Sequence, residues 1–299
     1  MLACLYLYSK QSGHAKSNIN KKMRTIILTI LSFLFSVCAL AQFNPNEPMK
    51  FCKHQVLDKS NTECIYTHIV EDVVLKEKQA YNEILMIGSK YSKYLEYGSF
   101  QKDSVTYDSG KKNWTFAEHY EMVSNYSYNS AVYEIRRKIG SNKLTFMDAV
   151  VIDKYVYEDS VSFNWKIGKE KMTVCGYPCR KATCEFRGRK WEAWFTNKIP
   201  VSLGPWKFSG LPGLILRVND DKNEHVFYAT CVRKGGNPIR KYERNYSKST
   251  REKVNKAIKT YHEDCTTYWG NTALVPKDMD GKPSEVPSKR LFFNAIEKK

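Results

Sequence analysis

Beyond residue 64, the hydrophobic positions fall into short runs rich in Tyr, Val, Ile, Phe and Thr, separated by Gly, Asn, Asp and Lys. This pattern is typical of β-strands joined by tight turns. Residues 65–70 predict one strand, and paired runs around turn residues predict hairpins over residues 83–97, 132–151, 181–196 and 214–232. Residues 42–61 are rich in Asn, Pro and Lys and are expected to form a loose lead-in.

Two segments have the spacing of helices. Residues 114–124 predict a short helix, and Ser249-Thr250-Arg251-Glu252 is a capping box that begins a second one. The apolar stripe of the second helix is narrow and lacks Phe and Trp, which favours packing on a sheet over binding to a membrane surface. No internal repeat or composition break appears. The sequence therefore predicts one mainly β (α+β) domain over residues 42–299, a mostly antiparallel curved sheet with one or two packed helices.

The start of the chain has the pattern of an export signal. An apolar run over residues 26–37 follows Lys21, Lys22 and Arg24 and precedes Ala39-Leu40-Ala41, which predicts a signal peptide over residues 23–41. The run is shorter than the roughly 20 apolar residues that span a bilayer, so we expect membrane contact only through the cleaved peptide. Translation from Met23 would make residues 1–22 an upstream extension. The expected location is the periplasm, the outer envelope or the extracellular space.

The chain is strongly basic. Its formal net charge is +17, and removal of residues 1–41 takes away five cations and no anion, which leaves +12. The excess is spread over residues 136–138, 187–190 and 248–259 rather than gathered in one patch. In an exported protein this favours a solvated face, or a surface that meets anionic lipid or polysaccharide, over nucleic-acid binding. The partner is unknown, and an envelope protein, a glycan or a lipid fits best.

Seven cysteines remain after the signal peptide: Cys52, Cys64, Cys175, Cys179, Cys184, Cys231 and Cys265. Disulfides persist outside the cytosol, and an odd number leaves at least one thiol unpaired or paired between chains. The pairing stays open: Cys52 and Cys64 would close a short loop, and members of the 175–184 group could pair across a hairpin or with Cys231. Zinc is disfavoured because no second cysteine pair with zinc-site spacing follows, so no metal and no cofactor is expected.

The most distinctive motifs lie within residues 175–218. They are GYPC at 176–179, FRGR at 186–189, AWFT at 193–196, GPWKF at 204–208 and GLPGLI at 210–215. In this order they resemble the GLPGLI family, exported bacterial envelope proteins of unassigned function. The resemblance extends more weakly to residues 85–94 and 103–104, and to Asn294-Ala295-Ile296-Glu297, where Ala295 replaces the Pro of the closing N-P-I-E of the family. It implies an envelope location and a shared architecture, and it carries no catalytic residue.

The signature residues predict a rigid corner of the backbone. Pro212 fixes φ, while Gly210 and Gly213 permit a tight reversal or a close approach of another segment. In this interpretation the aromatic and aliphatic side chains of the corner fill the core. The signature positions are Gly204, Pro205, Trp206, Gly210, Leu211, Pro212, Gly213, Leu214 and Ile215.

The alternative is a rigid rim around a ligand groove. There Trp194 and Trp206 would stack on a ligand, and Arg189 would supply a cationic contact. The stretch does not end in GK[ST] and does not open a helix, which disfavours a phosphate loop.

No catalytic constellation is visible in the sequence. This favours a non-enzymatic envelope protein that binds an apolar or lipid-linked ligand, a glycan or a partner protein, or a purely structural component. The alternative is an envelope hydrolase or peptidase with a cysteine nucleophile, for which Cys179 is the best candidate. That chemistry requires an imidazole or carboxylate beside the thiol, and the five histidines beyond residue 41 are scattered along the chain.

Overall fold

The computed structural model describes residues 44–126, 133–266 and 289–299. The predicted signal peptide over residues 23–41 and the upstream extension over residues 1–22 lie outside the described residues. The chain divides into two compact units. The described part of the smaller unit comprises residues 44–49 and 113–120, where Pro48 and Thr115 form an isolated β-bridge. The larger unit holds the remaining described residues.

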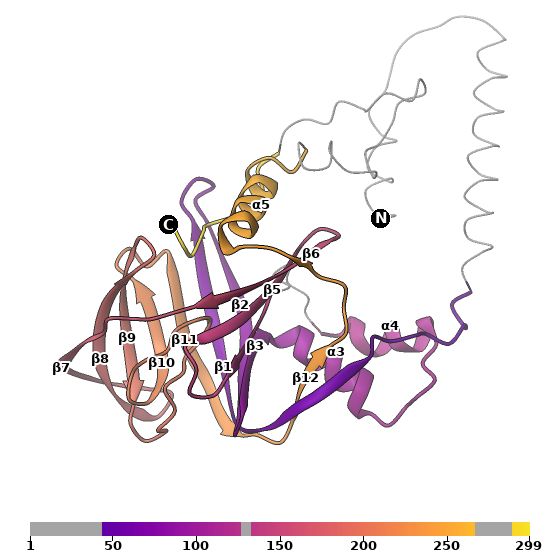
Figure 1. Ribbon diagram of the computed structural model, residues 1–299, viewed down its shortest axis with the longest axis horizontal. Helices are drawn as coiled ribbons and strands as arrows, with labels where there is room; N and C mark the ends of the chain where they lie inside the picture. Colours follow the sequence, from indigo (N-terminus) through magenta and orange to yellow (C-terminus); the bar gives the residue numbers. More distant parts are fainter. Residues whose placement is uncertain (1–43, 127–132, 267–288) are drawn as a thin grey trace, which may run out of the picture. The chain divides into compact units, whose positions relative to one another are not determined.

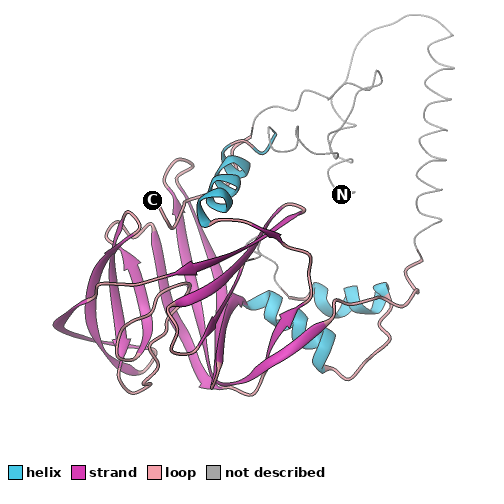
Figure 2. Ribbon diagram, in the orientation of Figure 1, coloured by secondary structure: helices cyan, strands magenta, loops and turns pink. Residues whose placement is uncertain are grey.

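The larger unit contains one sheet of thirteen strands (Figure 1). Its spatial order is β13-β6-β5-β4-β3-β2-β1-β11-β10-β9-β8-β7, and β12 pairs with the beginning of β1. The β13–β6 pair is parallel and the other pairs are antiparallel, which confirms the prediction of a mainly β protein with a mostly antiparallel, curved, open sheet (Figure 2). The strands are β1 (His54–Asp72), β2 (Glu77–Gly88), β3 (Tyr91–Glu96), β4 (Glu134–Lys138), β5 (Lys143–Val150), β6 (Asp153–Ser160), β7 (Lys166–Val174), β8 (Tyr177–Phe186), β9 (Arg189–Thr196), β10 (Leu214–Asp220), β11 (His225–Lys234), β12 (Pro238–Tyr242) and β13 (Ser247–Lys248).

The described residues form three helices, α3 (Tyr97–Asp108), α4 (Phe116–Ser124) and α5 (Arg251–Glu263), one more than the sequence predicts. The missing one is α3, which buries only Gly98 and therefore has no apolar stripe for a sequence pattern to reveal. The capping box of α5 is present, since the Thr250 side chain accepts a hydrogen bond from the backbone N–H of Lys253. The helix packs on β5 and β6 through buried Val254, as predicted. No helix in the described part of the chain is long and apolar enough to cross a membrane.

The expected loose lead-in over residues 42–61 is wrong in its second half. Residues from His54 onward belong to β1, where they pair with β12. Half of this stretch is solvent-exposed, so its polar side chains carry no hydrophobic alternation that would predict a strand. The stretch becomes a strand because it pairs with β12 (Pro238–Tyr242), some 180 residues away in sequence.

The signature segment between β9 and β10 forms a tight, buried corner. The Trp206, Phe208 and Leu211 side chains are at most 5% exposed and belong to the main core cluster. Backbone hydrogen bonds within the segment hold this reversal of the chain, including one of 2.9 Å from the N–H of Ile215 to the carbonyl of Leu203. A Cβ on Gly213 would lie 2.1 Å from the backbone oxygen of Thr196, so close approach is what requires glycine there.

Candidate functional site

The described residues line a cavity of about 580 Å³. Its walls come from β1, β2, β5, β11, α5 and the C-terminal segment, by which we mean residues 289–299. Apolar side chains form much of the lining, among them Val70, Phe146, Trp206, Ile258 and Phe292. Both the size and this lining are typical of small-molecule sites.

Glu83 of β2 is a buried carboxylate in the lining of the cavity. It is 1% exposed, and its carboxylate accepts hydrogen bonds from the hydroxyls of Tyr94 and Tyr133. Burial, and secondly the charge of Glu83, raises the pKa of both phenols, so they remain protonated donors. Nδ1 of His68 lies 3.6 Å from the Glu83 carboxylate, an ion-pair distance that is too long for a hydrogen bond.

His68 and His225 form a buried pair beside Glu83. Nε2 of His68 lies 3.2 Å from Nδ1 of His225, and the His68 ring stacks on Phe227 with 3.7 Å between ring centres. His225 is 2% exposed, and burial lowers its pKa well below the usual value, so the imidazole is neutral at physiological pH. Nε2 of His225 is buried and has no hydrogen-bond partner within the described part of the chain.

Asp148 of β5 is a second carboxyl group in the lining. Its Oδ1 accepts a hydrogen bond of 2.7 Å from the backbone N–H of Ala149. Burial raises its pKa to about 7, so protonated and ionised forms coexist near neutral pH.

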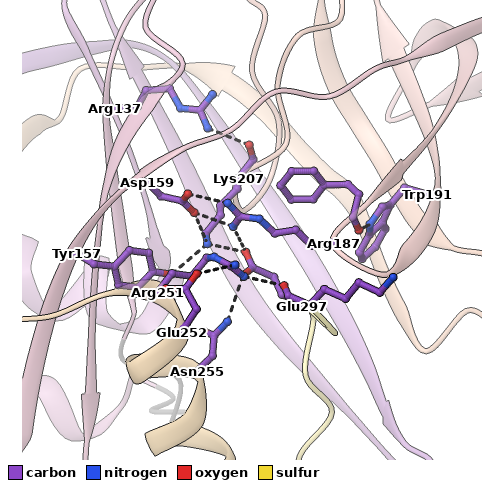
Figure 3. Close-up of polar contacts among 12 residues, drawn as sticks. Arg137, Tyr157, Asp159, Arg187, Trp191, Lys207, Arg251, Glu252, Asn255 and Glu297 are labelled. Atoms are coloured by element: carbon purple, nitrogen blue, oxygen red, sulfur yellow. Dashed lines mark hydrogen bonds and ion pairs between the residues drawn. The ribbon is translucent and has the colours of Figure 1, made fainter.

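An ion cluster borders the cavity through two of its members, Lys207 and Glu297, and Figure 3 shows its contacts. We define it as Lys207, Arg187, Arg251, Asp159 and Glu297. Nζ of Lys207 lies 3.0 Å from Asp159 and 2.6 Å from Glu297. Arg187 bonds both carboxylates at 2.6 Å, and Arg251 reaches Glu297 at 2.9 Å.

The electrostatics of the ion cluster favour charged carboxylates. Burial by itself would raise the pKa of Asp159, but hydrogen bonds from Arg187 and Lys207 hold it at about 2. The pKa of Glu297 is lowered in the same way against the effect of burial, chiefly by Lys207. Burial lowers the pKa of Lys207 more than its two carboxylates raise it. Trp206, the residue before Lys207 in the corner, has a φ of +50°, a backbone conformation that is strained for a residue with a bulky side chain.

The ion cluster and further polar contacts, two of them made by arginines, hold the C-terminal segment across the cavity. Arg189 is bonded to Asp220 and Glu224 at 2.7 Å each, and it donates at 2.7 Å to the backbone oxygen of Ala295. At the other end of the segment, Arg290 pairs with Asp72 at 3.1 Å. These contacts fix a stretch with no regular secondary structure as one wall of the cavity.

The three residues of the alternative ligand rim do not come together. Trp206 lines the cavity, whereas Arg189 is buried in its ion pairs and does not line it. Trp194 is 9% exposed, its indole N–H bonds Glu192, and it lies outside the cavity lining. The corner therefore contributes to the cavity through Trp206 and Lys207, and Arg189 acts on it only by holding the C-terminal segment.

All seven cysteines beyond residue 41 are described as free thiols. Cys179 is 2% exposed, its sulfur contacts the backbone oxygen of Tyr177, and burial raises its pKa to about 11. A thiol in this state is a poor nucleophile. Among the described residues, no group of three or more His, Cys, Asp or Glu side chains has an arrangement that could hold a metal ion.

Sequence reasoning missed the polar groups of the cavity. Glu83 has one local signal, since it directly precedes the apolar run Ile84–Ile87 in a strand that becomes buried from that point on. His68, Asp148 and His225 occur singly on separate strands, and only the sheet brings them together. Glu297 belongs to the N-A-I-E motif, which the sequence marked without a role.

Comparisons with known proteins identify little more. A family model described as "Protein of unknown function (Porph_ging)" matches residues 185–217, a segment that contains the FRGR, AWFT, GPWKF and GLPGLI motifs. A comparison with curated proteins gave no match. Two solved structures of PNGF-II, in space groups C2 and P21, are similar with 15% identity and TM-scores of 0.45 and 0.46, over 67% and 68% of this chain. The chain spans about a third of their length, 33% and 34%, and similarity this low assigns no function.

Proposed function

We propose that this chain is an exported, non-enzymatic envelope protein that binds a small ligand with an apolar body in the cavity beneath its C-terminal segment. The observation that carries the proposal is the cavity of about 580 Å³, which is large enough for a small organic molecule. More than half of its lining residues are aromatic or aliphatic, and five of the polar ones are buried: His68, Glu83, Lys207, His225 and Glu297. Such a site fixes the orientation of a ligand through the polar groups and gains affinity from apolar burial.

The cysteine-hydrolase alternative has weaker support. Cys179 is buried with a raised pKa, and the contact described for its sulfur is a backbone oxygen rather than a base. A nucleophilic cysteine requires a lowered pKa or a base within hydrogen-bond reach. The binding role fits the geometry better.

Fluorescence titration with N-phenyl-1-naphthylamine, a neutral apolar probe, tests the binding site. We expect saturable binding at one site per chain. Ala149→Trp fills the cavity and should weaken binding at least tenfold, whereas Ala80→Trp, a matched change at an exposed position of β2, should leave it unchanged. Equal affinity in both variants would place the probe elsewhere and refute the proposed site.

Export has its own test. Fractionation of cells that produce the full chain should recover the protein outside the cytoplasm, and sequencing of the recovered protein should begin at Gln42. An unprocessed chain in the cytosolic fraction would contradict the export part of the proposal.

A further inference from the structure

Two carboxyl groups of the cavity pair with no lysine or arginine among the described residues. Of the three acidic residues in the lining, Glu297 is neutralised by the ion cluster, while Glu83 and Asp148 form no ion pair with a lysine or arginine of the described chain. Glu83 receives hydrogen bonds from two tyrosines, and a carboxylate has about four acceptor sites, so it retains acceptor capacity. Oδ2 of Asp148 accepts none of the hydrogen bonds found within the described chain, where the backbone of Ala149 bonds Oδ1.

The histidine pair supplies a third acceptor. The carboxylate of Glu83 faces Nδ1 of His68, which favours a proton on that nitrogen. Nε2 of His68 then has no hydrogen and accepts, so Nδ1 of His225 must carry the hydrogen and donate it across their 3.2 Å contact. A neutral His225 with its proton on Nδ1 presents a lone pair at the buried Nε2, on a ring that interacts with the side chain of Asn294.

We propose that the cavity selects a ligand whose apolar body ends in a protonated amine, an inference that rests on the binding role proposed above. An ammonium group carries three N–H donors and no acceptor, and it complements the three acceptor groups of Glu83, Asp148 and His225. A buried acceptor without a donor is costly, and a charged donor satisfies it best. Aromatic rings in the lining, such as Tyr81 and Tyr133, add surfaces that attract a cation.

The positive charge of Lys207 does not oppose this ligand. Lys207 is the only lysine or arginine in the described lining, and both Asp159 and Glu297 bond its Nζ. Its ammonium is therefore compensated within the ion cluster, while the charge of Glu83 remains available.

Three probes with one apolar body test the preference in calorimetric titrations of the purified protein at pH 7.5. They are 4-phenylbutylamine, 4-phenyl-1-butanol and 4-phenylbutanoate, which share a phenyl group on a four-carbon chain and carry a cationic, a neutral and an anionic head group. We expect the amine to bind at least tenfold more tightly than the alcohol, and the carboxylate to bind most weakly. An alcohol or carboxylate that binds as tightly as the amine overturns the inference.

Charge-removing variants show where the preference arises. Glu83→Gln and Asp148→Asn keep the side-chain shape, and each should reduce the ratio of amine to alcohol affinity severalfold. Glu77→Gln, at the exposed start of β2, is the matched control and should leave the ratio unchanged. If Glu83→Gln does not fold, Asp148→Asn alone decides, and an unchanged ratio in the folded variants overturns the inference.

The outcomes separate the two levels of the proposal. Binding of all three probes with equal affinity removes the preference for a cation and leaves the cavity as a ligand site. Binding of N-phenyl-1-naphthylamine without binding of 4-phenylbutylamine likewise removes the preference for a cation and leaves the cavity as a ligand site. Failure of every probe, the neutral naphthylamine included, contradicts the binding function itself.

Discussion

Replacement of Glu297 by Gln tests whether buried charge holds the C-terminal segment in place. The side chain is 3% exposed and accepts hydrogen bonds from Lys207, Arg187, Arg251 and Asn255. The variant leaves three cations with one buried carboxylate. Removal of one partner from a buried ion pair costs about 3–5 kcal/mol, and the amide oxygen still accepts one or two of the bonds, so we expect a loss of about 3 kcal/mol.

Thermal unfolding measures this loss. A domain of this size changes its melting temperature by about 2–4 °C per kcal/mol, which corresponds to a decrease of about 6–12 °C. Glu252→Gln is the matched control because Glu252 also pairs with Arg251, at 2.8 Å, but is 67% exposed, and an exposed pair contributes little. Equal melting temperatures for the two variants would refute a structural role of the buried charge.

The pH dependence of the same comparison has a definite sign. The pKa of Glu297 is lowered in the folded state, so its carboxylate stabilises the fold fully above the ordinary carboxyl pKa, and this contribution is lost as the pH falls through the folded value. The wild type should therefore lose its advantage over Glu297→Gln in acid. An advantage that grows as the pH falls below 4 would contradict this assignment.

Three further predictions concern the cavity, the corner and the cysteines. The pKa of Asp148 is raised from 3.8 to about 7, so ionisation of this carboxyl group destabilises the fold as the pH rises through this interval. Asp148→Asn should therefore be more stable than the wild type by on the order of 3 kcal/mol at pH 8 but not at pH 4. Urea unfolding that shows no such pH dependence would contradict the raised pKa. In Gly213→Ala the new Cβ would lie 2.1 Å from the backbone oxygen of Thr196, so thermal unfolding should show a loss of stability of about 2–3 kcal/mol. Gly176→Ala should lose about 1 kcal/mol, because φ is +78° there and no atom lies within 4 Å of the new Cβ. Equal losses in the two variants would argue against the close approach at Gly213. Because burial raises its pKa to about 11, Cys179 should react with iodoacetamide at pH 8 about 100-fold more slowly than an ordinary thiol, and rapid labelling detected by mass spectrometry would contradict its burial.

Much of the sheet is predictable because its signals are local. Alternation around Gly188 reveals the β8–β9 hairpin, and the capping box at Ser249 reveals α5. The first part of β1 carries no such signal, because its strand conformation depends on pairing with the distant β12. Helix α3 is hidden for a related reason, since its side chains bury too little apolar surface to impose a period.

The cavity is much less predictable than the sheet. The register of β1 with β11 places His68 opposite Phe227 and Val70 opposite His225, which brings the two imidazoles together from positions 157 residues apart. Nothing in the sequence near either histidine specifies that register. The glycines and proline of the corner predict its rigid backbone. Its contribution to the cavity through Trp206 and Lys207 is not predictable from the same residues, because Glu297, which pairs with Lys207, lies near the other end of the sequence.

A crystal structure of the protein with 4-phenylbutylamine tests the central claim most directly, namely that the cavity beneath the C-terminal segment is the ligand site. The phenyl group should lie in the cavity against Trp206, with the ammonium nitrogen about 3 Å from Glu83, Asp148 or Nε2 of His225. An empty cavity in crystals soaked at a concentration that saturates binding in solution, or ligand density only at the outer surface, would contradict it.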